Sequence, residues 1–274
     1  MPPSVGAAEW LVMGILNVTP DSFHDGGRFA TLPAAMAQAR AMAAAGAGII
    51  DIGGESTRPG AAAVDIDDEL KRVIPVIEAV AAELELPLSI DTSKARVAAK
   101  ALKAGAVMIN DVTALKGDPR MAAVAAEAAC PVCLMHMLGE PRTMQDNPHY
   151  EDVVAQIGEF FQERIRFAVS QGIKRENIIL DPGIGFGKTV EHNLAILGNL
   201  DEFAAMGLPL MIGVSHKRFV GAVTGEDDTA GRLPGTIAAN VLARAGGAGI
   251  FRVHDVAENV QALEVAEAII KSHL

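Results

Sequence analysis

The sequence predicts an α/β protein that folds as a (β/α)8 or TIM barrel, and three observations support this prediction. The chain has 274 residues, and a barrel of this kind needs roughly 250 as one domain. Half of the residues are hydrophobic and 21% are charged, so the chain can bury a large core. Eight short apolar runs alternate with alanine-rich segments of helical pattern. We find no linker or shift in composition, and therefore expect residues 1–274 to form one domain.

The apolar runs are the predicted strands. They are short and rich in Ile, Val, Leu and Met, which is typical of parallel strands covered on both faces. In chain order they are Leu11–Leu16, Gly48–Ile52, Leu88–Ile90, Val107–Ile109, Val132–Met135, Asn177–Leu180, Leu210–Val214 and Gly249–Val253. The repeat of strand and helix favours a closed barrel, although this pattern alone leaves an open doubly wound sheet as the alternative.

Alanine-rich segments with helical periodicity follow most of these strands. The clearest predicted helices are Pro33–Ala45, Asp67–Leu84, Lys94–Ala104, Pro119–Ala129, Tyr150–Gln171 and Val256–Lys271. Glycines stand at several helix ends, where a left-handed backbone is common; they are Gly46, Gly105, Gly172 and Gly207. The helical segments are therefore expected to end at these glycines before the next strand begins.

Charge and cysteine content exclude several classes of protein. The net charge is −11, which argues against general binding to nucleic acid or to an anionic membrane but allows a small local anion site. No segment has the 18 consecutive apolar residues of a membrane span, and the first ten residues do not resemble a signal peptide. We therefore expect a cytoplasmic protein. Cys130 and Cys133 lie at the end of a helical segment and in an apolar run, so we expect buried free thiols rather than a redox pair.

Polar or ionisable side chains stand at the end of every predicted strand. They include Asn17, Thr57, Arg58, Asp91, Asn110, His136, Asp181, Ser215, Lys217, Arg252 and His254. In a barrel these ends meet at one rim, where active sites are built. Buried polar groups cost free energy unless they are paired. Their concentration at one rim therefore predicts an enzyme.

Two chemically different sets are present among these side chains. The anion-binding set combines four basic residues with two neutral oxygen ligands suited to phosphate or hydrated Mg²⁺: Arg58, Lys217, Arg252, His254, Asn17 and Thr57. The other set, with Lys217, suits the N–H donors and acceptors of a planar heterocycle: Asp91, Asn110 and Asp181. Ordinary salt bridges are the alternative for any one cation. Capping of the following helix is the alternative for Asp91, although Thr92 or Ser93 is the better cap candidate. We expect Asp111 and Asp255 to cap helices or to support neighbouring residues.

Other motifs are absent or structural. The glycine-rich segment 181–188 lacks the Walker and Rossmann spacings, so it indicates a loop that lets backbone approach a flat ligand. His136 has no second histidine at metal-binding spacing, and we interpret it as a structural residue. No Gly-x-Ser-x-Gly motif supports a hydrolase nucleophile.

Two long signatures resemble those of the dihydropteroate synthase family. They span residues 13–23 (MGILNVTPDSF) and 51–60 (DIGGESTRPG). Shorter matches follow in the same order at residues 89–92, 110–111, 181–188, 215–217 and 252–255. The resemblance covers the chain from about Leu11, and it implies a pterin-binding TIM barrel.

The resemblance implies a transferase of folate biosynthesis and a sulfonamide target. The family joins 6-hydroxymethyl-7,8-dihydropterin pyrophosphate to 4-aminobenzoate, giving 7,8-dihydropteroate and pyrophosphate by a dissociative reaction. It implies a pterin site of Asp91, Asn110, Asp181, Lys217 and Arg252. It implies a pyrophosphate site of Asn17, Thr57, Arg58, Arg252 and His254, with Asn17 also ligating Mg²⁺. It implies an aminobenzoate pocket of Phe23, Thr57, Pro59 and Ser215, with Asp91, Lys217 and Asn17 as the catalytic residues.

The sequence departs from the family pattern at three positions, and two related functions remain to be weighed. His24, His216 and Arg218 stand where many members have Ser, Arg and Ser, which affects details of the aminobenzoate pocket. A pterin-dependent methyltransferase would share the barrel and the pterin set but would not need the pyrophosphate residues. A non-catalytic pterin-binding paralogue would be expected to lack some of them. The family is usually a homodimer, and apolar faces on Thr236–Ala245 and Val256–Ile270 are compatible with one.

Overall fold

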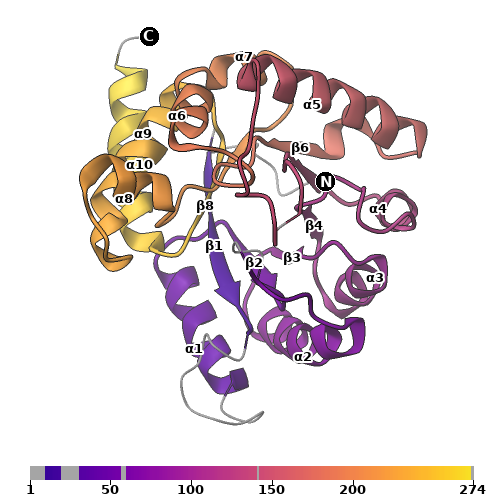
Figure 1. The fold of residues 1–274 in the computed structure, drawn as a ribbon. Coiled ribbons are helices and arrows are strands. Elements are labelled where there is room, and N and C mark those ends of the chain that lie inside the picture. Colours follow the sequence, from indigo (N-terminus) through magenta and orange to yellow (C-terminus); the bar gives the residue numbers. More distant parts are fainter. Residues whose placement is uncertain (1–9, 20–30, 57–59, 141, 273–274) are drawn as a thin grey trace.

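The computed structural model describes residues 10–19, 31–56, 60–140 and 142–272. Its eight strands form one parallel sheet, as predicted (Figure 1). The strands are β1 (Leu11–Asn17), β2 (Ile49–Gly53), β3 (Leu88–Asp91), β4 (Met108–Asp111), β5 (Val132–Met135), β6 (Ile178–Asp181), β7 (Met211–Ile212) and β8 (Ile250–Val253). The sheet order is β6-β5-β4-β3-β2-β1-β8-β7, and a parallel bridge between Leu180 and Leu210 joins its two outer strands. The sheet is therefore a nearly closed barrel and not the open doubly wound alternative.

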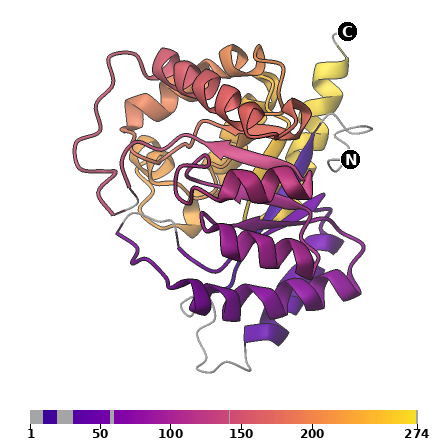
Figure 2. The same ribbon diagram turned by 90° about the vertical axis from the view of Figure 1, so that its right-hand side faces the viewer.

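Helices surround the strands on the outside of this barrel (Figures 1 and 2). They are α1 (Thr31–Ala44), α2 (Ile66–Glu83), α3 (Ala95–Ala104), α4 (Met121–Ala128), α5 (Val153–Ser170), α6 (Val190–Gly198), α7 (Leu200–Ala204), α8 (Arg218–Thr224), α9 (Leu233–Ala245) and α10 (Val256–Lys271). The six helices predicted from periodicity are all present within a few residues, and α9 contains the apolar segment expected at Thr236–Ala245. Only α6, α7 and α8 were not predicted. Their shortness explains this, because five to nine residues carry little periodic signal.

Local chemistry accounts for several element boundaries. The carboxylate of Asp152 accepts hydrogen bonds from the backbone N–H groups of Val154 and Ala155, both at 3.0 Å, and so begins α5. The four glycines expected at helix ends have positive φ angles between 69° and 124°. The strand predicted at Leu210–Val214 is shorter than expected, because only Met211 and Ile212 pair with β8.

Two hydrophobic layers form the core. A small cluster fills the barrel interior with one side chain from every strand except β3: Met13, Ile49, Met108, Cys133, Ile179, Met211 and Ile250. A larger cluster lies between the strands and the helices and includes Ile50, Ile90, Leu134 and Phe251. Successive strand residues point to opposite faces. Each strand therefore contributes alternately to the interior and to the outer layer.

Two further expectations can be compared with this core. Cys130 and Cys133 are buried and free, and burial raises the pKa of the Cys130 thiol to about 11, so both behave as hydrophobic residues. Within the described ranges, no helix combines the length and the apolar character needed to cross a membrane.

Candidate active site

Strand alternation places five polar side chains one layer above the hydrophobic plug of the barrel. Four of them stand two residues beyond a plug residue of their own strand: Asp51, Asn110, Asp181 and Arg252. The fifth, Asp91, stands two residues beyond the buried Ser89 of β3. Because the period of a strand is two residues, they share the inward orientation of the plug. The four acidic and amide side chains are at most 6% exposed. The inner mouth of the barrel is therefore polar, and its apolar floor excludes water from below.

Arg252 holds two of these carboxylates together. Its Nε donates to Oδ2 of Asp51 at 2.6 Å, and its Nη2 donates to Oδ2 of Asp91 at 2.7 Å. Burial lowers the pKa of the guanidinium, but the two carboxylates more than offset this and the net shift is upward. Arg252 was predicted to bind both pterin and pyrophosphate. Its guanidinium is held in position by the carboxylates of Asp51 and Asp91.

Asp51 is a site residue that sequence reasoning missed. It is fully buried, and its Oδ2 also accepts a hydrogen bond from Nδ2 of Asn110 at 2.9 Å. Its Oδ1 makes no hydrogen bond within the described part of the chain. The available signal was a carboxylate inside the apolar run of β2, which is costly unless it is paired.

Asp91 points into the barrel and does not cap α3. The first N–H of that helix, on Ala95, donates instead to Oδ2 of Asp118 at 3.1 Å. Thr92, the better cap candidate, accepts from the N–H of Lys94 at 3.2 Å. Burial raises the pKa of Asp91 to about 7, with Arg252 opposing the shift and neighbouring carboxylates adding to it. A carboxylate that titrates near neutral pH is suited to respond to charge on a bound ligand.

Asp181 and Lys217 lie on the opposite side of the mouth. Oδ1 of Asp181 accepts from the N–H of Gly183 at 2.8 Å, and burial raises its pKa against the opposing charge of Lys217. The Lys217 ammonium donates to the carbonyl of Ile184 and lies 4.7 Å from the centre of the Phe186 ring. Burial lowers the pKa of Lys217 to about 8.

The segment after β7 is braced by β8 and α9. Oγ of Ser215 lies 2.9 Å from Nδ1 of His254, so the residues assigned to aminobenzoate and to pyrophosphate are in contact. His216 has a φ of 54°, and its Nε2 lies 2.5 Å from Oδ2 of Asp255. Its backbone N–H donates to Oγ1 of Thr236 at 3.0 Å. The supporting role expected for Asp255 is confirmed, and His216 serves the same brace.

Asp111 and His136 are structural, as expected. Asp111 points away from the barrel interior and accepts from the N–H groups of Thr113 and Leu115 at 2.9 and 2.8 Å, which closes the turn after β4. His136 is buried, with Nδ1 3.0 Å from the ammonium of Lys188 and its ring edge against Phe160.

The two signature loops contribute further residues to the predicted site. Phe23, Thr57, Arg58 and Pro59, together with the departure at His24, lie outside the described residues. Asn17 ends β1 and is partly buried.

Glu55 lies just before residues 57–59, which contain the predicted site residues of the second signature. Its Oε2 lies 2.5 Å from the ammonium of Lys94, which also lies 2.5 Å from Oε2 of the fully buried Glu69. Its Oε1 accepts from the N–H of Val64 at 2.9 Å. This partly buried ion cluster anchors the described ends of the segment to α2 and α3.

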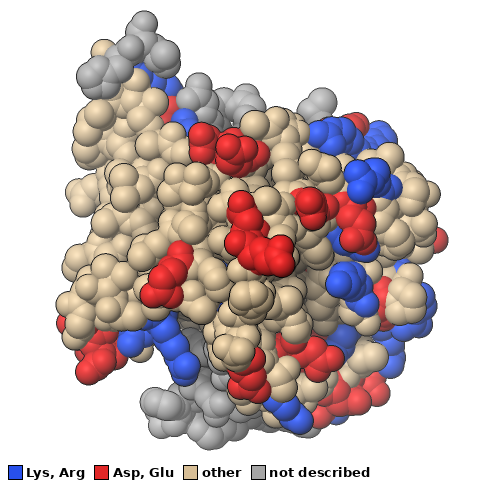
Figure 3. Space-filling view, turned by 45° about the horizontal axis from the view of Figure 1, so that its top comes forward, with Lys and Arg blue, Asp and Glu red and all other residues tan. Residues whose placement is uncertain are grey.

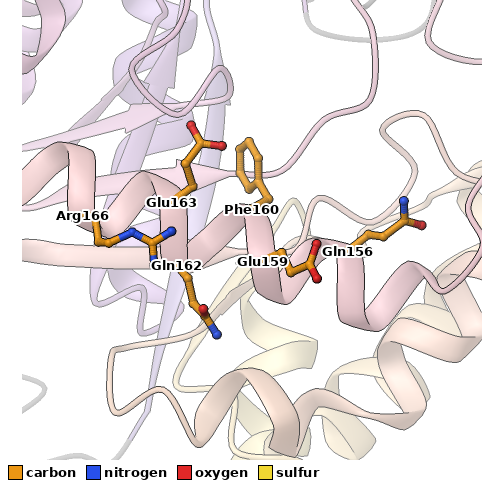
Figure 4. A pocket seen from close by; sticks show the side chains of 6 residues that line it. All are labelled: Gln156, Glu159, Phe160, Gln162, Glu163 and Arg166. Carbon is orange, nitrogen blue, oxygen red and sulfur yellow. The ribbon is translucent and has the colours of Figure 1, made fainter.

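A shallow hollow of about 530 Å³ lies on the face of α5. Its lining side chains all belong to that helix, as Figure 4 shows: Gln156, Glu159, Phe160, Gln162, Glu163 and Arg166. It lacks convergent groups from several strands, so the barrel mouth is the better candidate for an active site.

Comparison with known proteins agrees with this geometry. A family model for pterin binding enzymes matches residues 13–254. Dihydropteroate synthase from Escherichia coli K12 is 49% identical over 261 residues, covering 95% of this chain and 92% of the relative. The chain belongs to the dihydropteroate synthases. The enzyme of Synechocystis sp. is likewise 49% identical, over 94% of this chain and 89% of its own.

Solved dihydropteroate synthases share the barrel. The crystal structure of the Yersinia pestis enzyme with a sulfonamide drug complex aligns with a TM-score of 0.91 at 47% identity, covering 96% of this chain and 94% of the other. The Xanthomonas albilineans enzyme in complex with 7,8-dihydropteroate aligns with a TM-score of 0.86 at 44% identity, over 95% and 93% of the two chains. The predicted family, TIM-barrel fold and transferase activity in folate synthesis are therefore confirmed. The match favours dihydropteroate synthase over the methyltransferase and the non-catalytic paralogue.

Proposed function

We propose that the barrel mouth binds 6-hydroxymethyl-7,8-dihydropterin pyrophosphate and 4-aminobenzoate and joins them by a dissociative reaction. The observation that carries this proposal is the inward layer of carboxylate, amide and cationic groups above an apolar plug. A pterin edge offers several N–H donors in one plane, and ionised carboxylates are pure acceptors. Hydrogen-bond acceptors come from the ends of β3, β4 and β6, through Asp91, Asn110 and Asp181. Hydrogen-bond donors come from Lys217 and Arg252.

The first step breaks the bond between the pterin methylene carbon and the oxygen of pyrophosphate. The electron pair leaves with pyrophosphate, and the positive charge spreads over the pterin ring. The Asp91 carboxylate stabilises that charge, since an opposite charge in a water-poor site is strongly favourable. Arg252 is fixed by Asp51 and Asp91, so its guanidinium needs no reorganisation as the leaving group develops charge. His254 and, outside the described residues, Thr57 and Arg58 would bind the same group.

The second step forms the carbon–nitrogen bond. The neutral aryl amine attacks the methylene carbon with its lone pair, and the product ammonium then loses a proton to solvent or pyrophosphate. A neutral amine needs no strong base, which agrees with the absence of an activated-nucleophile motif. The pocket for 4-aminobenzoate would take Ser215 from the segment after β7, with Phe23, Thr57 and Pro59 from the two signature loops.

Mg²⁺ is the cofactor we propose, held at the end of β1 by the amide oxygen of Asn17. Within the described ranges no group of three or more His, Cys, Asp or Glu residues is arranged to hold a metal. Mg²⁺ is commonly bound by one or two protein oxygens plus substrate phosphates, so a single amide ligand fits an ion that arrives with pyrophosphate. When bound, the ion would neutralise charge on the leaving group. Asn17→Ala should raise the Mg²⁺ concentration that gives half-maximal rate, and an unchanged requirement would refute this role.

A homodimer is the assembly we propose, through the outer face of α9 and α10. These helices pack side by side, and Leu242, Val265 and Ile269 on them are 69%, 58% and 56% exposed. Figure 3 shows few charged side chains on the left of the molecule, where the C-terminal helices lie. Leu242→Glu should halve the mass measured by sedimentation equilibrium. A wild-type protein that sediments as a monomer would refute the assembly.

The cytoplasm is the compartment we propose for this activity. The expectation rests on the sequence, and cell fractionation would test it. Recovery of the protein from secreted or membrane fractions would contradict it.

Aminobenzoate-dependent release of pyrophosphate tests the reaction itself. The assay combines the protein with pterin pyrophosphate and Mg²⁺, with and without 4-aminobenzoate, and identifies 7,8-dihydropteroate by mass spectrometry. A sulfonamide should compete with 4-aminobenzoate, because a relative of known structure was solved with such a drug. Turnover without dependence on the amine, or no dihydropteroate, would overturn the proposal.

A further inference from the structure

Lys188 is a buried lysine that no step of the proposed reaction uses. It is 3% exposed and precedes Thr189, the N-cap residue of α6. Its ammonium lies 3.0 Å from Nδ1 and 3.3 Å from the carbonyl oxygen of His136, and 2.9 Å from the carbonyl oxygen of Phe186. All three of these partners, taken from the residues that the structure describes, are neutral, although a buried cation without a contacting carboxylate is costly. This cost suggests that the charge has a purpose at the site.

The partner histidine is adapted to a neighbouring cation. Burial, together with the charges of Lys188 and Lys116, lowers the pKa of His136 to about 3. The ring is therefore neutral at pH 7, and we assign its Nδ1 as the acceptor because an ammonium can only donate.

The loop before Lys188 is held by its carbonyl oxygens. Four consecutive carbonyls, of residues 184 to 187, each accept from a different side chain; the donors are Lys217, Gln145, Lys188 and Tyr150. Lys217 and Lys188 thus hold alternate carbonyls of one loop. A Cβ at Gly183 would overlap the carbonyl oxygen of His136. The loop therefore has little freedom to move apart from the segment after β5.

The charge of Lys188 acts on the carboxylate at the start of this loop. Burial lowers the pKa of Lys188 to about 7, with Asp181 opposing the shift and Lys217 adding to it. Burial raises the pKa of Asp181, and three nearby cations oppose this rise: Lys217, Arg252 and Lys188. Lys217 is free to turn toward a substrate only by leaving the carbonyl of Ile184, whereas Lys188 is enclosed and stays in place.

We propose that Lys188 is a positioning residue that fixes the loop on which Lys217 rests and keeps Asp181 ionised for the pterin. The ammonium is held by His136 and Phe186, so it acts through the loop and through Asp181. The inference rests on the proposed function, since it takes Asp181 and Lys217 as pterin-binding residues.

The test measures binding of 6-hydroxymethylpterin by fluorescence as a function of pH. Lys188→Met removes the charge and retains the apolar stem. It should weaken binding about tenfold below pH 7, where Lys188 carries its charge because its pKa is about 7. Loss of a nearby cation raises the pKa of a carboxylate, so the acid limb of the affinity profile should move up by about one pH unit. Lys188→Arg keeps the charge and should leave that limb in place. The exposed Lys174, changed to Met, is the matched control and should bind like the wild type.

The outcomes separate this inference from the site assignment. The titratable and charged groups that act on Asp181 or contact Lys188 are Lys217, Arg252 and the neutral His136. The shift of the acid limb is therefore attributed by repeating the measurement in Asp181→Asn, where Lys188→Met should no longer move the limb. An equal loss of affinity at every pH, or no loss, would overturn the inference. Unchanged pterin affinity in Asp181→Asn would instead overturn the proposed pterin site. If Lys188→Met does not fold, Lys188→Gln gives the same test because it also removes the charge.

Discussion

Replacing Asp51 by Asn tests whether the buried carboxylate positions Arg252. The side chain is fully buried, and its Oδ2 receives hydrogen bonds from Arg252 and Asn110 at 2.6 and 2.9 Å. Asn has nearly the same volume and keeps an acceptor oxygen, so the substitution removes charge while disturbing packing little. Arg252 retains Asp91 at 2.7 Å as its second partner.

The expected loss of stability follows from this geometry. Removing one partner of a buried ion pair costs about 3–5 kcal/mol when the other charge is left alone. Because Asp91 remains, we expect the lower end of that range, about 3 kcal/mol. An unfolding entropy of about 2.1 cal/mol/K per residue over 274 residues gives about 0.58 kcal/mol/K, so Tm should fall by about 5 °C.

The same substitution should change the pH dependence of the reaction. The negative charge of Asp51 contributes to the raised pKa of Asp91, which is about 7. Removing that charge lowers the pKa of Asp91, so the acid limb of kcat/KM for the pterin pyrophosphate should move to lower pH. Thermal unfolding by circular dichroism and a pH–rate profile measure the two effects, with the exposed Asp146→Asn as control. If Asp51→Asn has the same Tm and the same acid limb of kcat/KM as the wild type, the positioning role of Asp51 is refuted.

Three further predictions concern the mouth of the barrel. Asp91→Asn should lower kcat by about 10²-fold or more while leaving pterin binding largely intact; equal losses in a binding assay and in kcat would mean that Asp91 only binds. The profile of kcat/KM against pH should rise as Asp91 ionises near its pKa of about 7 and fall as Lys217 loses its proton near its pKa of about 8, whereas a plateau that continues far above pH 8 would contradict a role for the ammonium. Gly183→Ala, at a φ of 68° and against the carbonyl of His136, should destabilise by about 2–4 kcal/mol in urea unfolding. Gly225→Ala, at a φ of 76° with no atom within 4 Å of the added Cβ, should lose only about 1 kcal/mol, and similar losses at both glycines would mean that close packing at residue 183 is unimportant.

The sequence was sufficient to place most of the inward polar layer, with Asp51 as the exception, because that placement depends on local periodicity. Eight apolar runs predicted the strands, and the residues just beyond them predicted Asp91, Asn110 and Asp181 as neighbours at one rim. Alternation along a strand needs only two residues to decide which face a side chain joins. The same alternation separates Asp111, which supports a turn outside the barrel, from Asn110, which faces inward.

Pairing across the barrel was decided only by the tertiary structure. Arg252 meets Asp51 across 201 residues of chain and Asp91 across 161, and no local pattern specifies which carboxylates an arginine will reach. Closure is likewise a long-range event, because it pairs the first strand with the last, Leu11 of β1 with Ile250 of β8. The pKa of a buried carboxylate depends on every charge that closure brings near it. The sequence therefore determined most of the residues that line the mouth, whereas closure of the barrel determined which of them share a counter-ion.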